Sequence, residues 1–190
     1  MTILAISTSQ PLAGVAVAAG DAFRWCEVPA ANTGEHLRTA VADVLRGDTV
    51  SLVVVETGPG SYTGGRIGVA FGQGFARAKA VAWVGITVWN ILSELAPNGY
   101  LPVTAVRSGE VLVQLISGEV RNLPMRDCPA PPFGFPLLNP AKYGGDKTMQ
   151  GSAPELAEWL RTLCRLAAGG AGSSQLPKYH DRFSVRVEPQ

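Results

Sequence analysis

The sequence predicts a globular α/β protein that begins with a mixed sheet covered by helices. Apolar residues make up 46% of the 190 residues and charged residues 16%, a balance that allows a buried core and differs from the charge-rich composition of disordered chains. Short apolar runs alternate with helical patterns over residues 1–97. These runs are far shorter than the roughly 20 residues that cross a bilayer, so we expect no membrane helix.

Three antiparallel strands are predicted at the start of the chain. Residues 2–6 and 14–18 are apolar runs that flank a polar turn at 7–11. A third, partly alternating run at 23–28 follows a turn at Gly20. The apolar start carries no basic segment and no cleavage site, so we expect no secretory signal and a cytoplasmic location.

A helix is predicted after these strands. Asn32 and Glu35 have the spacing of a capping box, and the helix should end near Gly47. Apolar residues recur at helical spacing between these limits: Leu37, Ala40, Val41, Val44 and Leu45.

The next segment adds two strands and two helices. Residues 51–56 form an apolar run without alternation, which is typical of an interior strand covered on both faces. A glycine-rich loop and a helix of small residues reach Lys79, and then a strand at 81–84 and a helix at 88–95 follow. The predicted order is βββαβαβα.

A boundary is predicted at residues 97–99, which divides the chain into 1–97 and a shorter second half at 98–190. The second half begins with a strand pair at 101–106 and 111–116. Its proline-rich segment at 124–140 has little periodicity. One helix is expected over 153–168, with four leucines on its apolar face: Leu156, Leu160, Leu163 and Leu166.

The glycine-rich loop could hold an anion, because it follows a buried strand and opens a helix, where backbone N–H groups and the helix dipole favour negative charge. The residues that could contact the anion are Gly58, Gly60, Ser61 and Thr63. Nucleotide fingerprints do not fit. A Walker loop would need Lys and Ser/Thr where Arg66 and Ile67 stand, and Thr63 takes the place of the third glycine of a dinucleotide fingerprint. A structural turn or an interface loop is the alternative.

Small residues recur every fourth position in the helix after this loop: Gly64, Gly68, Gly72, Ala76 and Ala80. Each helical glycine costs roughly 1 kcal/mol relative to alanine. The repeat therefore predicts close approach of another backbone, either within this fold or from a partner chain. Gly74 is a further helical glycine that this strip does not explain.

Metal ligands and nucleophile-base pairs are scarce. The two histidines, His36 and His180, are far apart, and no cluster of cysteine and histidine occurs. Cys26, Cys128 and Cys164 are odd in number and widely separated, so no disulfide framework is expected. A net charge of +1 without a basic block predicts no nucleic-acid surface of the chain's own.

Several motifs resemble one known family. Residues 58–68 read GPGSYTGGRIG, very similar to GPGSFTGLRIG, the signature of the TsaB (YeaZ) family, and residues 3–9 read ILAISTS, similar to that family's ILAIDTS. Residues 107–111 are similar to the family's ARRGEV hairpin, and residues 177–179 to its PxY ending. The chain is therefore identified as resembling this family, most closely in its first half.

This resemblance implies an actin-like ATPase fold with two βββαβαβα halves, the second shortened here. It also implies a non-catalytic scaffold subunit of the complex that forms threonylcarbamoyladenosine at position 37 of tRNA. The expected partners are a TsaD-like catalytic subunit, a TsaE-like ATPase and, for the chain alone, a second copy. We expect tRNA contact only through the complex, and nucleotide and metal only in the partner subunits, with no cofactor bound by this chain alone.

The resemblance, together with the small-residue strip, predicts an association surface at Gly64, Arg66, Gly68, Gly72 and Ala76, where Arg66 would pair with a carboxylate or phosphate. Two departures bear on activity, because Ser7 and Ala105 stand where the family has aspartates. A nucleotide-binding ATPase or kinase, which would need such acidic groups, and a glycoprotease-like peptidase remain the alternatives.

Overall fold

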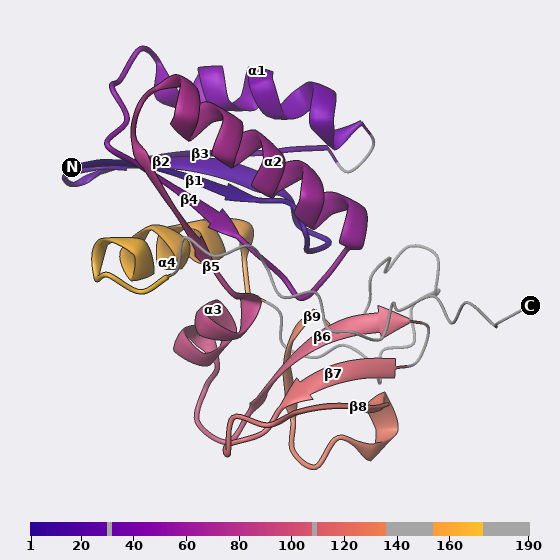
Figure 1. Ribbon diagram of the computed structural model, residues 1–190. Coiled ribbons are helices and arrows are strands. Elements are labelled where there is room, and N and C mark those ends of the chain that lie inside the picture. The colour runs from indigo at the N-terminus through magenta and orange to yellow at the C-terminus, as the bar shows by residue number, and fades with distance from the viewer. Residues whose placement is uncertain (30–31, 108–109, 136–153, 173–190) are drawn as a thin grey trace, which may run out of the picture.

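The computed structural model describes residues 1–29, 32–107, 110–135 and 154–172. Its first sheet has five strands in the order β3-β2-β1-β4-β5, with β2 antiparallel to β1 and β3, and β4 parallel to β1 and β5 (Figure 1). The strands are β1 (Thr2–Ser7), β2 (Gly14–Ala19), β3 (Ala22–Glu27), β4 (Leu52–Glu56) and β5 (Ala82–Ile86).

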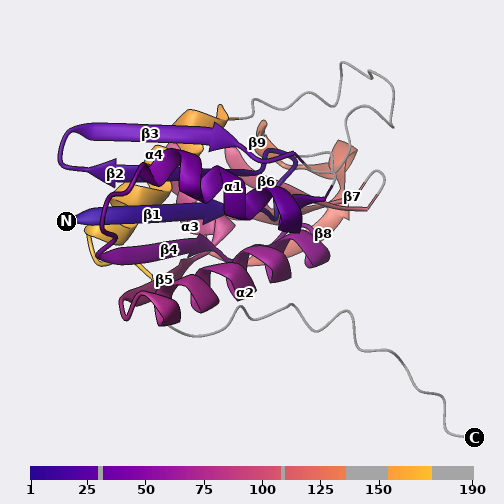
Figure 2. The same ribbon diagram turned by 90° about the horizontal axis from the view of Figure 1, so that it is seen from above.

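Helices cover both faces of this sheet. On one face, α1 (Thr33–Leu45) and α2 (Tyr62–Ala78) lie side by side and enclose a core with alternate residues of β1, β2 and β4 (Figure 2). On the other face, α4 (Leu156–Ala168) crosses the strands and packs beside α3 (Val88–Leu95). Among the described residues, no helix is long and apolar enough to span a bilayer.

The second sheet has four strands in the order β8-β7-β6-β9, with β9 parallel to β6. They are β6 (Leu101–Arg107), β7 (Glu110–Gln114), β8 (Val120–Pro124) and β9 (Pro132–Phe135), and a 3₁₀ turn, η1 (Met125–Asp127), follows β8. Phe133 and Phe135 of β9 belong to the core under α4. The second sheet is therefore joined to the first through the α3 and α4 layer.

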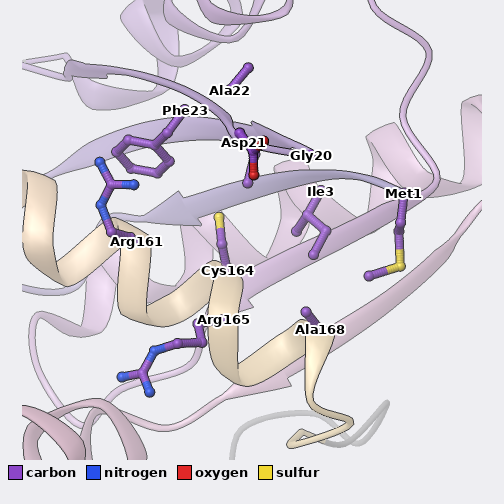
Figure 3. Close-up of a pocket in the computed structure, with 11 residues that line it drawn as sticks. Met1, Ile3, Gly20, Asp21, Ala22, Phe23, Arg161, Cys164, Arg165 and Ala168 are labelled. Atoms are coloured by element: carbon purple, nitrogen blue, oxygen red, sulfur yellow. The ribbon is translucent and has the colours of Figure 1, made fainter.

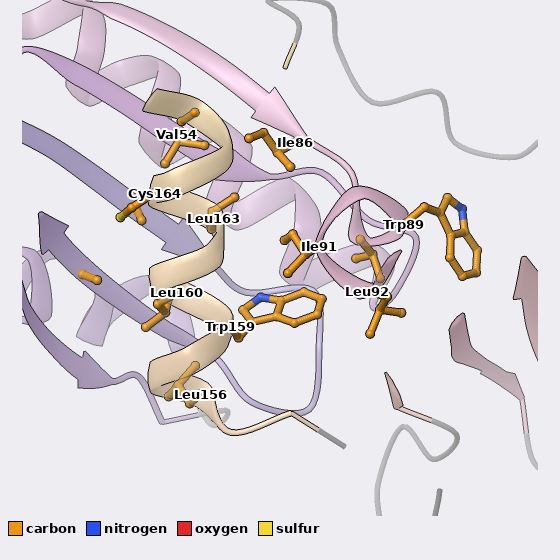
Figure 4. Close-up of a cluster of buried hydrophobic side chains, with 14 of the residues drawn as sticks. Val54, Ile86, Trp89, Ile91, Leu92, Leu156, Trp159, Leu160, Leu163 and Cys164 are labelled. Carbon is orange, nitrogen blue, oxygen red and sulfur yellow. The ribbon is translucent and has the colours of Figure 1, made fainter. Parts of the chain in front are cut away.

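Trp159 of α4 lies at the centre of that layer. Figure 4 shows its indole reaching from α4 towards Ile91 and Leu92 of α3. The ring of Phe135 meets it edge-on, with 5.2 Å between the ring centroids. An edge-to-face pair of this kind adds to the stabilisation from burial. Trp159 thus connects the two sheets through apolar contact.

The predicted order of elements is confirmed as far as α3, and the strand at 51–56 is interior, between β1 and β5. The predicted capping box is wrong, because Asn32 adopts a left-handed backbone with φ 57° and its side chain makes no capping hydrogen bond. The sequence did not predict β8, which ends at the first residue of the proline-rich segment, or β9, which lies within that segment. The division near residue 97 stays a prediction, although α4, from the second part, packs on the first sheet.

The small residues of α2 face the chain's own sheet, so the prediction that they form a partner interface is wrong for this face. A Cβ atom at Gly64 would lie 2.1 Å from Thr8 O, one at Gly68 would lie 2.3 Å from Thr8 Oγ1, and one at Gly72 would lie 2.4 Å from Val55 Cγ2. Ala76 is also buried, whereas Ala80 lies beyond the end of the helix. The glycines allow α2 to rest on β1 and β4 without side chains between them.

Gly72→Ala should destabilise the fold, whereas Gly74→Ala should stabilise it. A methyl group at Gly72 forces α2 away from Val55, and we expect a loss of about 1–3 kcal/mol in the free energy of unfolding. Nothing lies within 4 Å of a Cβ atom at Gly74, so alanine there should add about 0.5–1 kcal/mol through its better helix propensity. Urea unfolding measures both changes, and equal effects would contradict this packing of α2.

Candidate functional site

A network of buried polar groups lies where the carboxyl ends of β1 and β4 face the second sheet. Its centre is Glu56, the last residue of β4, whose side chain is fully buried. We call the seven residues that share the network the Glu56 cluster: Ser7, Ser9, Gln10, Glu56, Gly58, Thr104 and Trp159. Because β1 and β4 are parallel, their last residues and the turns that follow them meet at one edge of the sheet.

Four donors converge on the Glu56 carboxyl group. The Ser9 hydroxyl lies 2.7 Å from Oε1 and 2.8 Å from Oε2, and the Ser9 N–H donates to Oε2 over 3.3 Å. The Ser7 hydroxyl donates to Oε2 over 3.3 Å, and the Gly58 N–H donates to Oε1. The turn after β1 and the loop after β4 are therefore tied to one carboxyl group.

The outer part of the cluster reaches the second sheet and α4. The Trp159 indole N–H donates to Ser7 Oγ over 3.0 Å. The Gln10 amide donates to Ser9 Oγ over 3.0 Å and to the Pro59 carbonyl oxygen over 2.7 Å. The amide oxygen of Gln10 accepts a hydrogen bond of 3.2 Å from the Thr104 hydroxyl of β6. Four separate parts of the chain thus meet in one hydrogen-bond network.

Burial raises the pKa of Glu56 above its ordinary value. Loss of contact with water disfavours the charged form, and the hydrogen bonds from Ser9, Gly58 and Ser7 oppose this effect without overcoming it. No arginine, lysine or histidine of the described segments forms an ion pair with this carboxyl group. We therefore assign the neutral acid as the favoured form of Glu56 over a wider pH range than for an exposed glutamate.

The glycine-rich loop packs closely against the turn after β1. A Cβ atom at Gly60 would lie 2.4 Å from both Gln10 Nε2 and Ser9 O, so only glycine fits there. The Ser61 N–H donates to Ser9 O over 2.6 Å, and the Ser61 hydroxyl accepts from the Gly64 N–H over 3.2 Å as the cap of α2.

These bonds bear on the predicted anion site at Gly58, Gly60, Ser61 and Thr63, because two of its N–H groups are already used within the chain. The N–H groups of Gly58 and Ser61 donate to acceptors within the chain. Atoms of Gln10 and Ser9 occupy the space that a side chain at Gly60 would need. Thr63 is exposed in the first turn of α2, away from the Glu56 cluster. Gly58 of this loop therefore donates to a carboxyl group of its own chain, and an external anion at the loop stays a prediction.

Arg66 lies on the outward side of α2 and is separated from the buried small residues. Its guanidinium lies over the ring of Tyr62, 5.0 Å from the centroid, and its Nη1 donates to Tyr62 Oη over 3.1 Å. Both side chains are exposed. The predicted interface residues thus divide into four small residues that face inward and one arginine that faces solvent.

A second strip of small residues follows Arg66 on the exposed side of α2. Ala70, Gly74 and Ala78 continue the four-residue spacing from Arg66, and all three are exposed. The half-buried rings of Phe71 and Phe75 stack beside it, with centroids 6.2 Å apart. Among the residues that the structure describes, no contact accounts for Gly74. The sequence does not show directly that Gly74 points outward. The offset of two positions from Gly72 indicates it, because residues two positions apart lie on opposite sides of a helix.

A hollow of about 340 Å³ lies between α4 and the turn from β2 to β3 (Figure 3). Its arginines already have partners, since Arg161 lies 4.1 Å from the Phe23 ring centroid and Arg165 pairs with Glu94 at 2.7 Å. Burial raises the pKa of Cys164 there to about 12, so its thiol is unreactive near neutral pH. The hollow offers no identifiable chemistry. Within the described ranges, no three His, Cys, Asp or Glu residues are grouped to hold a metal ion.

Comparisons with known proteins agree with the motifs. No family model matches the chain. The chain is 34% identical over 131 residues to the tRNA threonylcarbamoyladenosine biosynthesis protein TsaB of Bacillus subtilis (strain 168). This match covers 60% of this chain and 55% of that protein, so the chain spans little more than half the length of this curated relative.

Solved structures share the fold. YeaZ from Pseudomonas aeruginosa superposes with a TM-score of 0.66 at 22% identity, over 94% of this chain and 99% of that chain. A protein described as similar to peptidase YEAZ from Pseudomonas aeruginosa gives the same TM-score at 24% identity, over 94% and 98%. The resemblance to the TsaB (YeaZ) family is thereby confirmed, and the mixed α/β architecture with two sheets is similar to that of YeaZ.

Ser7→Asp should destabilise the chain, although it restores the residue type that the family has at this position. The new carboxyl group would be buried beside Glu56, and no described cation lies there to balance a charge on either group. We expect a loss of about 3 kcal/mol in the free energy of unfolding at pH 7 and a smaller loss at pH 5, where a shared proton relieves the repulsion.

The double variant Ser7→Asp/Glu56→Gln is the matched control, because it removes one of the two acids. It should recover most of the loss in urea unfolding. Strictly additive effects of the two substitutions would contradict direct coupling between positions 7 and 56.

Proposed function

We propose that this chain is a TsaB-like scaffold subunit of a complex that forms threonylcarbamoyladenosine in tRNA, and that it belongs to the TsaB (YeaZ) family with an actin-like ATPase fold. The observation that carries this proposal is the segment at 58–68, which matches the family signature and forms the loop and helix start next to the Glu56 cluster. The match to the TsaB protein of Bacillus subtilis supports the same tRNA modification.

The chain has no catalytic role of its own in this proposal. Ser7 is fully buried with its hydroxyl between Glu56 and Trp159, and Ala105 is a buried methyl group on β6. Neither can supply the charge that the aspartates of an actin-like kinase or ATPase give to metal and phosphate. ATP or ADP and the metal would reside in the partner subunits, and this chain alone would bind no cofactor.

The partners would be a TsaD-like catalytic subunit and a TsaE-like ATPase, with a second copy of the chain as the partner when it is alone. We assign the association surface to the outward side of α2, with Arg66, Ala70, Gly74 and Ala78, in place of the buried strip. Small exposed residues on a helix let a second helix approach closely. The near-neutral charge supports contact with tRNA only through the complex. The proposed location of the complex is the cytoplasm.

Gly74→Leu should weaken partner binding without loss of the fold. The position is open, so the added side chain should be tolerated in the free chain but should block close helix approach. We expect at least a tenfold rise in the dissociation constant for the TsaD-like subunit, measured by calorimetry. Ala168→Leu is the control, since it adds similar bulk at an exposed position of α4 on the opposite face of the sheet.

Reconstitution tests the function itself. TsaD, TsaE, threonylcarbamoyl-adenylate and tRNA are combined with this chain, with the Gly74→Leu variant, or without either. Modification should need the unaltered chain and should fall with the variant. Equal modification without the chain, or turnover by the chain alone, would show that the scaffold role is wrong.

A further inference from the structure

Within the described residues, the Glu56 cluster connects four segments that are far apart in the sequence through one hydrogen-bond network. Ser7 and Ser9 bring the turn after β1, Gly58 brings the loop that opens α2, and Trp159 brings α4. Gln10 extends the network to Thr104 on β6 of the second sheet. Ser7, Ser9 and Gly58 donate to one carboxyl group, and Trp159 and Gln10 are bonded to it through Ser7 and Ser9.

The surroundings of Glu56 favour an uncharged group. On α4, Arg161 lies over Phe23, Arg165 pairs with Glu94, and the Cys164 thiol is neutral because burial raises its pKa to about 12. The remaining described titratable side chains of the adjoining helices are exposed: Tyr62, Arg66, Arg77, Glu155 and Glu158. Strands β1 and β5 contain no titratable residue, and neither does β6 over residues 101–105.

The hydrogen bonds also suit a neutral acid. Only the N–H groups of Ser9 and Gly58 must donate, whereas the hydroxyl groups of Ser7 and Ser9 can either donate or accept. A protonated Glu56 can therefore give its own hydrogen to the Ser9 hydroxyl, which donates in turn to the other carboxyl oxygen, while the Ser7 hydroxyl accepts from Trp159 and still donates to Oε2.

We propose that Glu56 is a neutral-acid latch that holds the two sheets together, and that removal of its proton opens the junction between them. Loss of the proton leaves a full charge in a site that is closed to water and in which no described residue supplies a cation. Water can reach that charge only if the turn after β1, the glycine-rich loop and Trp159 move apart. The latch does not depend on the proposed tRNA function, since it concerns the isolated chain.

Glu56→Gln tests the latch, because glutamine keeps the size and hydrogen-bonding capacity of the neutral acid but cannot ionise. In the unfolded chain a glutamate titrates near pH 4.5, and the folded chain keeps its proton to higher pH. Between the pKa of the unfolded chain and that of the folded chain, the free energy of unfolding must fall as pH rises. The folding equilibrium constant then falls by up to about tenfold per pH unit.

We expect the stability of the natural chain relative to Glu56→Gln to fall between pH 5 and pH 9 in urea unfolding. Glu27→Gln is the matched control at an exposed strand end. The stability of the natural chain relative to Glu27→Gln should not fall over this pH range. A difference between the natural chain and Glu56→Gln that stays constant or grows with pH would overturn the proposal.

Hydrogen exchange of the natural chain tests the opening even if Glu56→Gln fails to fold. After correction for intrinsic exchange rates, protection of residues 7–10, 58–64, 101–105 and 156–163 should fall together as pH rises, at least tenfold more than protection of α1. Unchanged protection in these segments, or a loss spread equally over α1, would overturn the latch.

Discussion

The buried carboxyl group of Glu56 determines how the parts of this chain meet. It stands at the end of β4, where four donors from the turn after β1 and from the glycine-rich loop reach it. Because the loop is fixed there, Ser61 is placed to cap α2, and the helix starts close against the sheet. The same network extends through Ser7 and Gln10 to α4 and β6. A buried acid without a cation is costly, so every one of these donors contributes to keeping the junction closed.

The position of α2 gives its two sides different roles. The inward glycines let the helix backbone rest on β1 and β4, and side chains at these positions would collide with Thr8 and Val55. The outward side keeps Gly74 and two alanines exposed, and no contact in the described part of the chain offsets the cost of Gly74 in helix stability. Close packing within the fold and the proposed association with a partner can therefore use one helix of 17 residues without competing for the same residues.

Local pattern predicted much of this fold, because apolar spacing and turn residues fix the elements up to α3. The direction of the small-residue strip could not be predicted in that way, since glycine at every fourth position suits a sheet or a partner equally. The Glu56 cluster was also missed. Apart from the bonds from Gly58 to Glu56 and from Gln10 to Ser9, its hydrogen bonds join residues 47 to 152 positions apart in the sequence, and the local pattern around Glu56 does not indicate these distant partners. Strand β9 was missed because its parallel pairing with β6 depends on a distant partner and its segment is rich in proline.

The most direct measurement is the protonation state of Glu56 in the folded chain. Selective ¹³C labelling of glutamate, with Glu56→Gln to assign the signal, allows the carboxyl carbon of Glu56 to be followed by NMR as pH rises. Its chemical shift should remain that of a neutral acid well above pH 4.5, the ordinary value for glutamate, and should change together with signals from Ser9 and Trp159. A carboxyl carbon that titrates at or below pH 4.5 would show that Glu56 is an ordinary charged group and would contradict the latch.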